Sequence, residues 1–169
     1  PGVLKAETAA GNIEFANDLI LYPSARGQLT VLAGKNIAAA GAKTSLYIHQ
    51  SDTDPAFLPS WSKPATQLDN NTPMSDTAMH RLLGYINLAP STMLHTKSTL
   101  HADDIEPSII NALGDIESSS TTILEFNLSE QSRIGARDIV STNFVIQNNR
   151  ASDVSEIYAQ RDFLSPVNF

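Results

Sequence analysis

The chain has 169 residues, of which 18 are Asp or Glu and 11 are Lys or Arg, so its net charge is −7. Because the basic residues are not clustered, binding to nucleic acid or to an anionic membrane surface is not expected. The sequence contains no cysteine, which excludes disulfides and thiolate metal sites, and no apolar run approaches the roughly 18–20 residues that span a bilayer.

The N-terminal part of the chain is predicted to form short strands, because it holds β-forming segments with rough alternation of apolar and polar residues. A five-residue phrase occurs there twice, as AAGNI and AGKNI, and its closing residues, Ile13 and Ile37, lie 24 positions apart. In the last of these segments Leu46 and Ile48 are expected to share one face, with Tyr47 and His49 on the other. The predicted strands are 13–15, 19–22, 28–32 and 44–50.

Residues 51–99 interrupt this pattern and are predicted to be an irregular insertion that projects from the rest of the domain. Prolines at positions 55, 59, 64 and 73 and the run DNNTP (69–73) indicate irregular chain. A short helix is expected at about 76–83, with Ser75 as its N-cap and Gly84 as its end. Trp61 and Tyr85, with Tyr47 beside the insertion, are candidates for stacking on a sugar ring. Packing of Trp61 against the body of the protein is the favoured alternative.

In residues 100–169 the phrase recurs, as HADDI, ALGDI, GARDI and AQRDF. The closing residues of the last three copies, Ile116, Ile139 and Phe163, lie 23 and 24 positions apart. The Asp before each of them is expected to accept hydrogen bonds from nearby backbone N–H groups and to hold a tight bend. The acidic residues are Asp115, Asp138 and Asp162, and the closing residues expected to point inward are Ile13, Ile37, Ile105, Ile116, Ile139 and Phe163.

A fixed period of 20–30 residues is typical of solenoid proteins. No leucine-rich phrase and no helical stripe accompanies the period, whereas a turn carrying two or three short strands fits a parallel β-helix. The sequence therefore predicts an all-β solenoid in which the closing residues lie one above the next. The whole chain, 1–169, is expected to be a single β-helix fragment. The alternative is a chance recurrence of the phrase in an ordinary β-sandwich.

No catalytic, cofactor or metal site is predicted. Asp52, Asp54, Asp103 and Asp104 are the acidic pairs to consider for calcium or acid–base chemistry, and ordinary loop carboxylates are the favoured interpretation. The four histidines form no HExxH motif, so a metal site would need them to converge from separate turns of the chain. Arg137 and Arg161 lie one period apart and are expected to stack and to neutralise neighbours such as Asp138 and Asp162.

Several segments resemble the filamentous haemagglutinin family, the large exoproteins of Gram-negative two-partner secretion. They are GQLTVLAGKNI (27–37), SLYIHQSDTDPAFLPS (45–60), the H-A-x-D-x-E-P step (101–107) and the run from SRIGARDI to AQRDF (132–163). The resemblance spans about residues 10 to 165 and implies a right-handed β-helix. The chain departs from the usual phrase at Ala136 and Gln160, which replace the bend glycine, and at Phe163, which replaces the closing Ile.

The expected function is therefore a non-enzymatic, structural or adhesive segment of a secreted or surface-exposed exoprotein, acting as a rigid scaffold. The resemblance implies export through a two-partner outer-membrane transporter and contact with a host-cell or bacterial receptor. Because the chain begins with Pro-Gly and has no signal peptide, it is expected to be a piece of a longer protein. Two alternatives remain: a carbohydrate-active β-helix enzyme or carbohydrate-binding module, and a fibre subunit that associates end to end.

Overall fold

The computed structural model describes residues 2–21, 24–40, 44–50, 101, 103–119 and 121–164. These residues form 14 strands and no helix, arranged as three parallel sheets. The prediction of an all-β chain is confirmed for this part of the sequence. The helix expected at 76–83 lies outside the described residues.

Each sheet takes every third strand of the chain. The first sheet has the order β1 (Leu4–Thr8), β4 (Leu29–Ala33), β7 (Ser108–Ala112), β10 (Ser132–Ala136) and β13 (Glu156–Ala159). The second has β2 (Ile13–Phe15), β5 (Ile37–Ala39), β8 (Ile116–Glu117), β11 (Ile139–Val140) and β14 (Phe163–Leu164). The third has β3 (Leu19–Leu21), β6 (Ser45–Gln50), β9 (Ile123–Leu128) and β12 (Thr142–Ile146).

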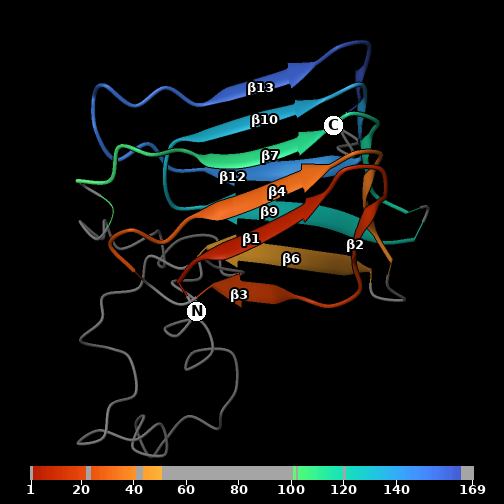
Figure 1. Cartoon of the computed structure of the whole chain (residues 1–169), viewed down its shortest axis with the longest axis horizontal. Helices are drawn as coiled ribbons and strands as arrows, with labels where there is room; N and C mark the ends of the chain where they lie inside the picture. The colour runs from red at the N-terminus through yellow and green to blue at the C-terminus, as the bar shows by residue number, and fades with distance from the viewer. Residues whose placement is uncertain are drawn as a thin grey trace, which may run out of the picture.

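Successive groups of three strands therefore form repeat units: β1–β3, β4–β6, β7–β9 and β10–β12, followed by β13 and β14. Figure 1 shows the strands of the first sheet lying one above another, with strands of the third sheet behind them running in the opposite direction. Because equivalent strands pair in register, each inward-pointing side chain lies above its counterpart in the preceding unit.

The closing residues of the phrase form one such column in the second sheet. Ile13 pairs with Ile37, Ile37 with Ile116, Ile116 with Ile139, and Ile139 with Phe163. Ile37, Ile116 and Ile139 are fully buried, and burial of such a side chain stabilises the fold by about 1.5–3 kcal/mol. Phe163 is 50% exposed, because among the described strands β14 has a neighbour, β11, on one side only.

Ile105 does not belong to this column, contrary to expectation. It is 69% exposed and lies in the connection before β7, and Ile37 pairs directly with Ile116 in its place. The match of HADDI to the phrase is therefore misleading, because five loosely constrained positions also fit this irregular segment, which ends at Pro107.

The polar residue before each closing residue bonds along the stack and not within its own bend. Asn12 Oδ1 accepts the backbone N–H of Asn36 at 3.2 Å, and Asn36 Oδ1 accepts that of Asp115 at 3.0 Å. Asp138 Oδ1 accepts the N–H of Asp162 at 3.2 Å. The role expected for these positions was a local one, whereas the structure uses them to join consecutive units.

Both arginines contact Asp138, as expected, and Arg137 has a further partner in Asp115 that was not expected. Arg137 forms a two-pronged contact with Asp115, with Nε–Oδ1 and Nη2–Oδ2 distances of 3.0 and 2.6 Å. Arg161 contacts Asp138 in the same way through its Nε and Nη2. Each guanidinium therefore binds the acid of the preceding unit, one period back, and not chiefly the Asp beside it in sequence.

Candidate functional site

A group of buried polar side chains lies at the corner where the chain passes from the third sheet to the first. Gln50 occupies in β6 the register position that Leu21 occupies in β3, and Ser108 pairs with Ser132 at the start of β7 and β10. Gln50, Ser108 and Ser132 are all at most 2% exposed. At this corner, core positions that are apolar in the N-terminal units are polar, which creates an environment for a buried charge.

Glu130 is the charged residue in that environment, and it lies in the turn between β9 and β10. Its side chain is 1% exposed. Its Oε1 accepts a hydrogen bond from Gln50 Nε2 at 2.9 Å and another from Ser108 Oγ. Its backbone carbonyl accepts the hydroxyl of Ser132 at 2.9 Å. These contacts fix the carboxylate at one oxygen and orient the other.

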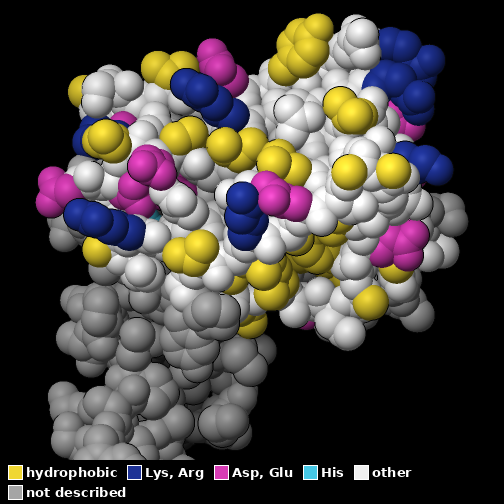
Figure 2. Space-filling view, viewed as in Figure 1, with side chains coloured by type: hydrophobic (Ala, Val, Ile, Leu, Met, Phe, Trp, Pro, Cys, Tyr) yellow, Lys and Arg dark blue, Asp and Glu magenta, His cyan; other side chains and the backbone are white. Residues whose placement is uncertain are grey.

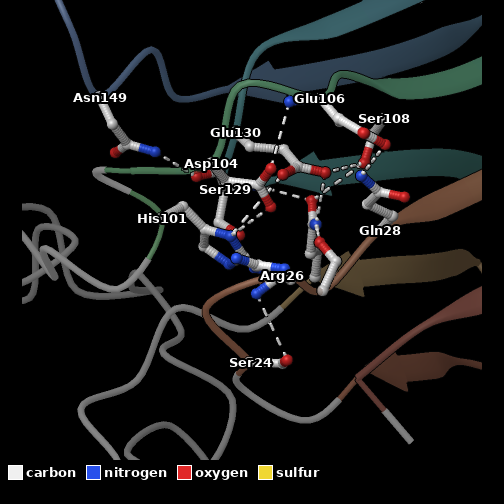
Figure 3. Close-up of polar contacts among 12 residues, drawn as sticks. Ser24, Arg26, Gln28, His101, Asp104, Glu106, Ser108, Ser129, Glu130 and Asn149 are labelled. Carbon is white, nitrogen blue, oxygen red and sulfur yellow. Dashed lines mark hydrogen bonds and ion pairs between the residues drawn. The ribbon is translucent and has the colours of Figure 1, made fainter.

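The free oxygen of Glu130 faces a second turn, which precedes β7 and contains His101 and Asp104 (Figure 3). The N–H of Asp104 donates to the carbonyl of His101 at 3.1 Å, and its Oδ1 accepts the N–H of Glu106 at 3.1 Å. His101 Nδ1 lies 3.7 Å from Glu130 Oε2 and 3.9 Å from Asp104 Oδ2. We call His101, Asp104 and Glu130 the corner cluster.

The corner cluster brings two carboxylates together in a buried place, at an energetic cost. Burial raises the pKa of Glu130 to about 7; hydrogen bonds from Ser108 and Gln50 lower it, and the neighbouring charge of Asp104 raises it. Glu130 Oε2 and Asp104 Oδ2 are buried and accept no hydrogen bond from the described residues. A buried acceptor without a donor costs free energy, so these two oxygens call for a physical explanation.

Solvent reaches the edge of the corner cluster through an open hollow of about 680 Å³. Asp104 forms part of its wall, beside the exposed Asp103. Gln28 Nε2 donates to Glu106 Oε2 at 3.0 Å across the same wall, linking the segment before β4 to the segment before β7. The remaining lining residues are Ala25, Arg26 and Ile105.

Of the predicted ligand-contact residues the structure describes only Tyr47, which is not a member of this cluster. Tyr47 lies in β6, half-buried, and its backbone N–H donates to Asp18 Oδ1 at 3.0 Å. Trp61, Tyr85, Asp52 and Asp54 lie outside the described residues. The column residues Ile13, Ile37, Ile116, Ile139 and Phe163 and the acids Asp115, Asp138 and Asp162 belong to the second sheet and its approach.

From the sequence, Asp104 was considered as one of an acidic pair with Asp103, and His101 as one of four histidines that would have to converge to bind a metal. Glu130, Gln50 and Ser108 were not singled out. One signal was available: in SLYIHQ, the alternation that points Leu46 and Ile48 inward also points Gln50 inward. A polar residue in a core position requires a polar partner nearby. That partner, Glu130, lies 80 positions after Gln50 and 22 positions after Ser108 in the sequence, so no local pattern connects them.

Comparisons with models of protein families, with curated proteins and with solved structures find no match to this chain. Within the described ranges, no helix exists that is long and apolar enough to cross a membrane. The function is therefore argued from the geometry of the repeat units and of the corner cluster.

Proposed function

We propose that this chain is a right-handed parallel β-helix segment of a filamentous-haemagglutinin-like exoprotein, and that it serves as a rigid, non-enzymatic scaffold that presents contact surfaces. The observation that carries the proposal is the register of the second sheet, in which Ile37 pairs with Ile116 although 79 positions separate them. Equivalent strands stack directly on one another, and nearly all parallel crossovers in proteins are right-handed.

Stiffness follows from the way consecutive units are joined. Backbone hydrogen bonds connect all units in the three sheets, and side chains add contacts along the same direction: the Asn12–Asn36–Asp115 series and the two arginine–aspartate contacts. Phe126 and Phe144 stack with ring centroids 5.6 Å apart in the core of the third sheet. Such a body deforms little under load, as an adhesive shaft requires.

The outer faces provide contact surface. Figure 2 shows charged side chains of both signs among hydrophobic side chains on the face formed by the first sheet, and some of the hydrophobic side chains adjoin one another. Residues 51–99 interrupt the repeat between β6 and β7 and, as an insertion, belong to the kind of segment that carries recognition in solenoid proteins. Export through a two-partner outer-membrane transporter, exposure at the surface of a Gram-negative bacterium and binding to a host-cell or bacterial receptor are parts of this proposal.

The test is an adhesion assay with beads that carry the folded chain, applied to host epithelial cells and to Gram-negative bacteria. We expect specific attachment, competed by the free protein and abolished when the protein is unfolded before coupling. Beads carrying a disulfide-free β-sandwich domain of similar charge are the control. Attachment equal to that control would reject the adhesive role.

A carbohydrate-active enzyme on the same framework is tested by incubating the chain with acidic polysaccharides, with and without calcium. The scaffold proposal predicts no new reducing or unsaturated ends. Cleavage by the chain that disappears in Asp104→Asn, while circular dichroism shows that variant to be folded, would replace the scaffold by an enzyme.

A further inference from the structure

We infer that the corner cluster is a binding site for one divalent metal ion of the zinc class, held by His101 Nδ1, Asp104 Oδ2 and Glu130 Oε2. These three donor atoms lie within 4.8 Å of one another, and all three residues are buried. The site goes beyond the scaffold function, since it would tie one particular connection of the chain to the stack.

The ligand chemistry favours a metal that accepts both nitrogen and oxygen. Imidazole and carboxylate together suit zinc and similar divalent transition metals, whereas calcium and magnesium prefer sites made of oxygen only. Two ligands held at about 2.0–2.2 Å by a tetrahedral ion lie about 3.3–3.6 Å apart. The distances from His101 Nδ1, 3.7 and 3.9 Å, are close to this spacing and too long for a hydrogen bond.

The acidic groups of the corner cluster also favour a bound cation. Asp104 and Glu130 place two carboxyl groups side by side in a buried place, and in the described part of the chain neither of them forms an ion pair with Lys or Arg. Buried charges in proteins are paired or bind metals. One divalent cation neutralises the two carboxylates.

The hydrogen bonds around the site are arranged as supports for metal ligands. Asp104 Oδ1 is held by the N–H of Glu106, and Glu130 Oε1 is held by Gln50 and Ser108. In each carboxylate one oxygen is fixed in this way, while the other, Oδ2 or Oε2, accepts no hydrogen bond from the residues that the structure describes and faces the imidazole. Partners of this kind orient the ligands of known metal sites.

The position of the site in the chain suggests what binding does. Gln50 ends β6, immediately before the insertion, and His101 and Asp104 lie where the described chain resumes before β7. An ion bound to His101, Asp104 and Glu130 would fasten the returning chain to the β9–β10 turn. The hollow beside Asp104 gives the ion a route from solvent.

The experiment is calorimetric titration of the EDTA-treated, dialysed full chain with zinc chloride, together with thermal unfolding with and without zinc. We expect one ion per chain, with a micromolar or lower Kd, and a rise in Tm. Asp104→Asn and Glu130→Gln keep the shape of the side chains and should weaken binding by at least about 10-fold to 100-fold. Asp103→Asn, an exposed neighbour on the same turn, is the matched control and should bind like the wild type.

The result that overturns the inference is the absence of saturable binding, or binding that Asp104→Asn and Glu130→Gln leave unchanged. If a variant fails to fold, the zinc titration of the wild type alone tests whether the site binds metal. Crystals soaked in zinc should show an anomalous peak about 2.0–2.2 Å from the three donor atoms. A peak only elsewhere, or none, rejects the site.

Discussion

Among the described residues, Asp138 is the acid that accepts the most hydrogen bonds between consecutive units. It accepts two hydrogen bonds from the guanidinium of Arg161 and one from the backbone N–H of Asp162. The hydrogen bonds from Arg161 are the main cause that lowers the pKa of Asp138 from 3.8 to about 2. Since the folded pKa is below the unfolded one, the carboxylate stabilises the fold above pH 3.8, and this contribution is lost as the pH falls toward 2.

We therefore predict that Asp138→Asn is less stable than the wild type at neutral pH and that the difference shrinks between about pH 4 and pH 2. Urea unfolding midpoints across this range measure it. Asp103→Asn, at an exposed position, is the control. A gap between Asp138→Asn and the wild type that is as wide at pH 2 as at pH 7 would contradict the role given to the Arg161 contact.

The pKa of Glu130 is shifted in the opposite direction to that of Asp138. Its pKa is raised by burial from 4.5 to about 7, so the folded protein binds a proton more tightly than the unfolded chain does. In metal-free protein the free energy of unfolding should therefore fall as the pH rises from 4.5 through 7. The whole shift corresponds to at most about 3 kcal/mol, at about 1.4 kcal/mol for each pKa unit.

Glu130→Gln removes this titration while it can still accept the hydrogen bonds of Gln50 and Ser108. In EDTA we predict that the variant is more stable than the wild type at pH 8, by up to about 3 kcal/mol, and similar to it below pH 4.5. Chemical denaturation at the two pH values measures the difference. Equal pH dependence in both proteins would show that Glu130 is not the group responsible.

At the scale of the element, the bend before β5 depends on the absence of a side chain at Gly34. A Cβ added there would lie 2.1 Å from the carbonyl oxygen of Ala9, which belongs to the backbone of the preceding unit. At Gly135 the nearest atom would be the side-chain nitrogen of Asn111, at 3.2 Å. Backbone at 2.1 Å cannot yield locally, whereas an exposed amide can rotate.

We predict that Gly34→Ala lowers the free energy of unfolding by about 1–3 kcal/mol, the range typical of overpacking. Gly135→Ala should change it by less than about 0.5 kcal/mol, because Ala also restricts the unfolded chain. Urea titration of both variants is the measurement. If Gly34→Ala and Gly135→Ala lowered the free energy of unfolding equally, the close approach of the Ala9 backbone to Gly34 would not be the cause of the loss in stability.

The sequence predicts these elements unevenly, for physical reasons. Strands and the Ile37–Ile116–Ile139 column follow from β-forming residues and a fixed period, because stacking forces equivalent positions into contact. The position of Ile105 was predicted wrongly because its five-residue phrase is not directly preceded by a described strand of the first sheet, as the phrases ending at Ile37, Ile116 and Ile139 are. Glu130 could not be found, because its environment is assembled from strands brought together only by the fold.

At the scale of the whole molecule, two kinds of contact hold the repeat units together. One is periodic: ladder hydrogen bonds, the isoleucine column and the arginine–aspartate pairs recur in successive units. The other occurs once, at the corner where Gln50, Ser108 and Glu130 interact. The periodic contacts join equivalent positions of successive units, while the corner lies beside Gln50 and His101, between which the repeat is interrupted.

Because the periodic contacts directly join the units on either side of the interruption, we predict that residues 53–98 can be replaced by a short Gly/Ser linker without loss of the fold. Strands on either side of the interruption pair directly: β4 with β7, β5 with β8 and β6 with β9. Shortening the connection lowers the entropy of closing it and should raise the free energy of unfolding by about 1 kcal/mol. Circular dichroism should retain its β-sheet form, and urea unfolding should show a single transition.

A matched variant with residues 53–98 in scrambled order separates the effect of length from that of sequence. Loss of cooperative unfolding in both variants would mean that residues 51–99 are part of the folded body and not an insertion into it.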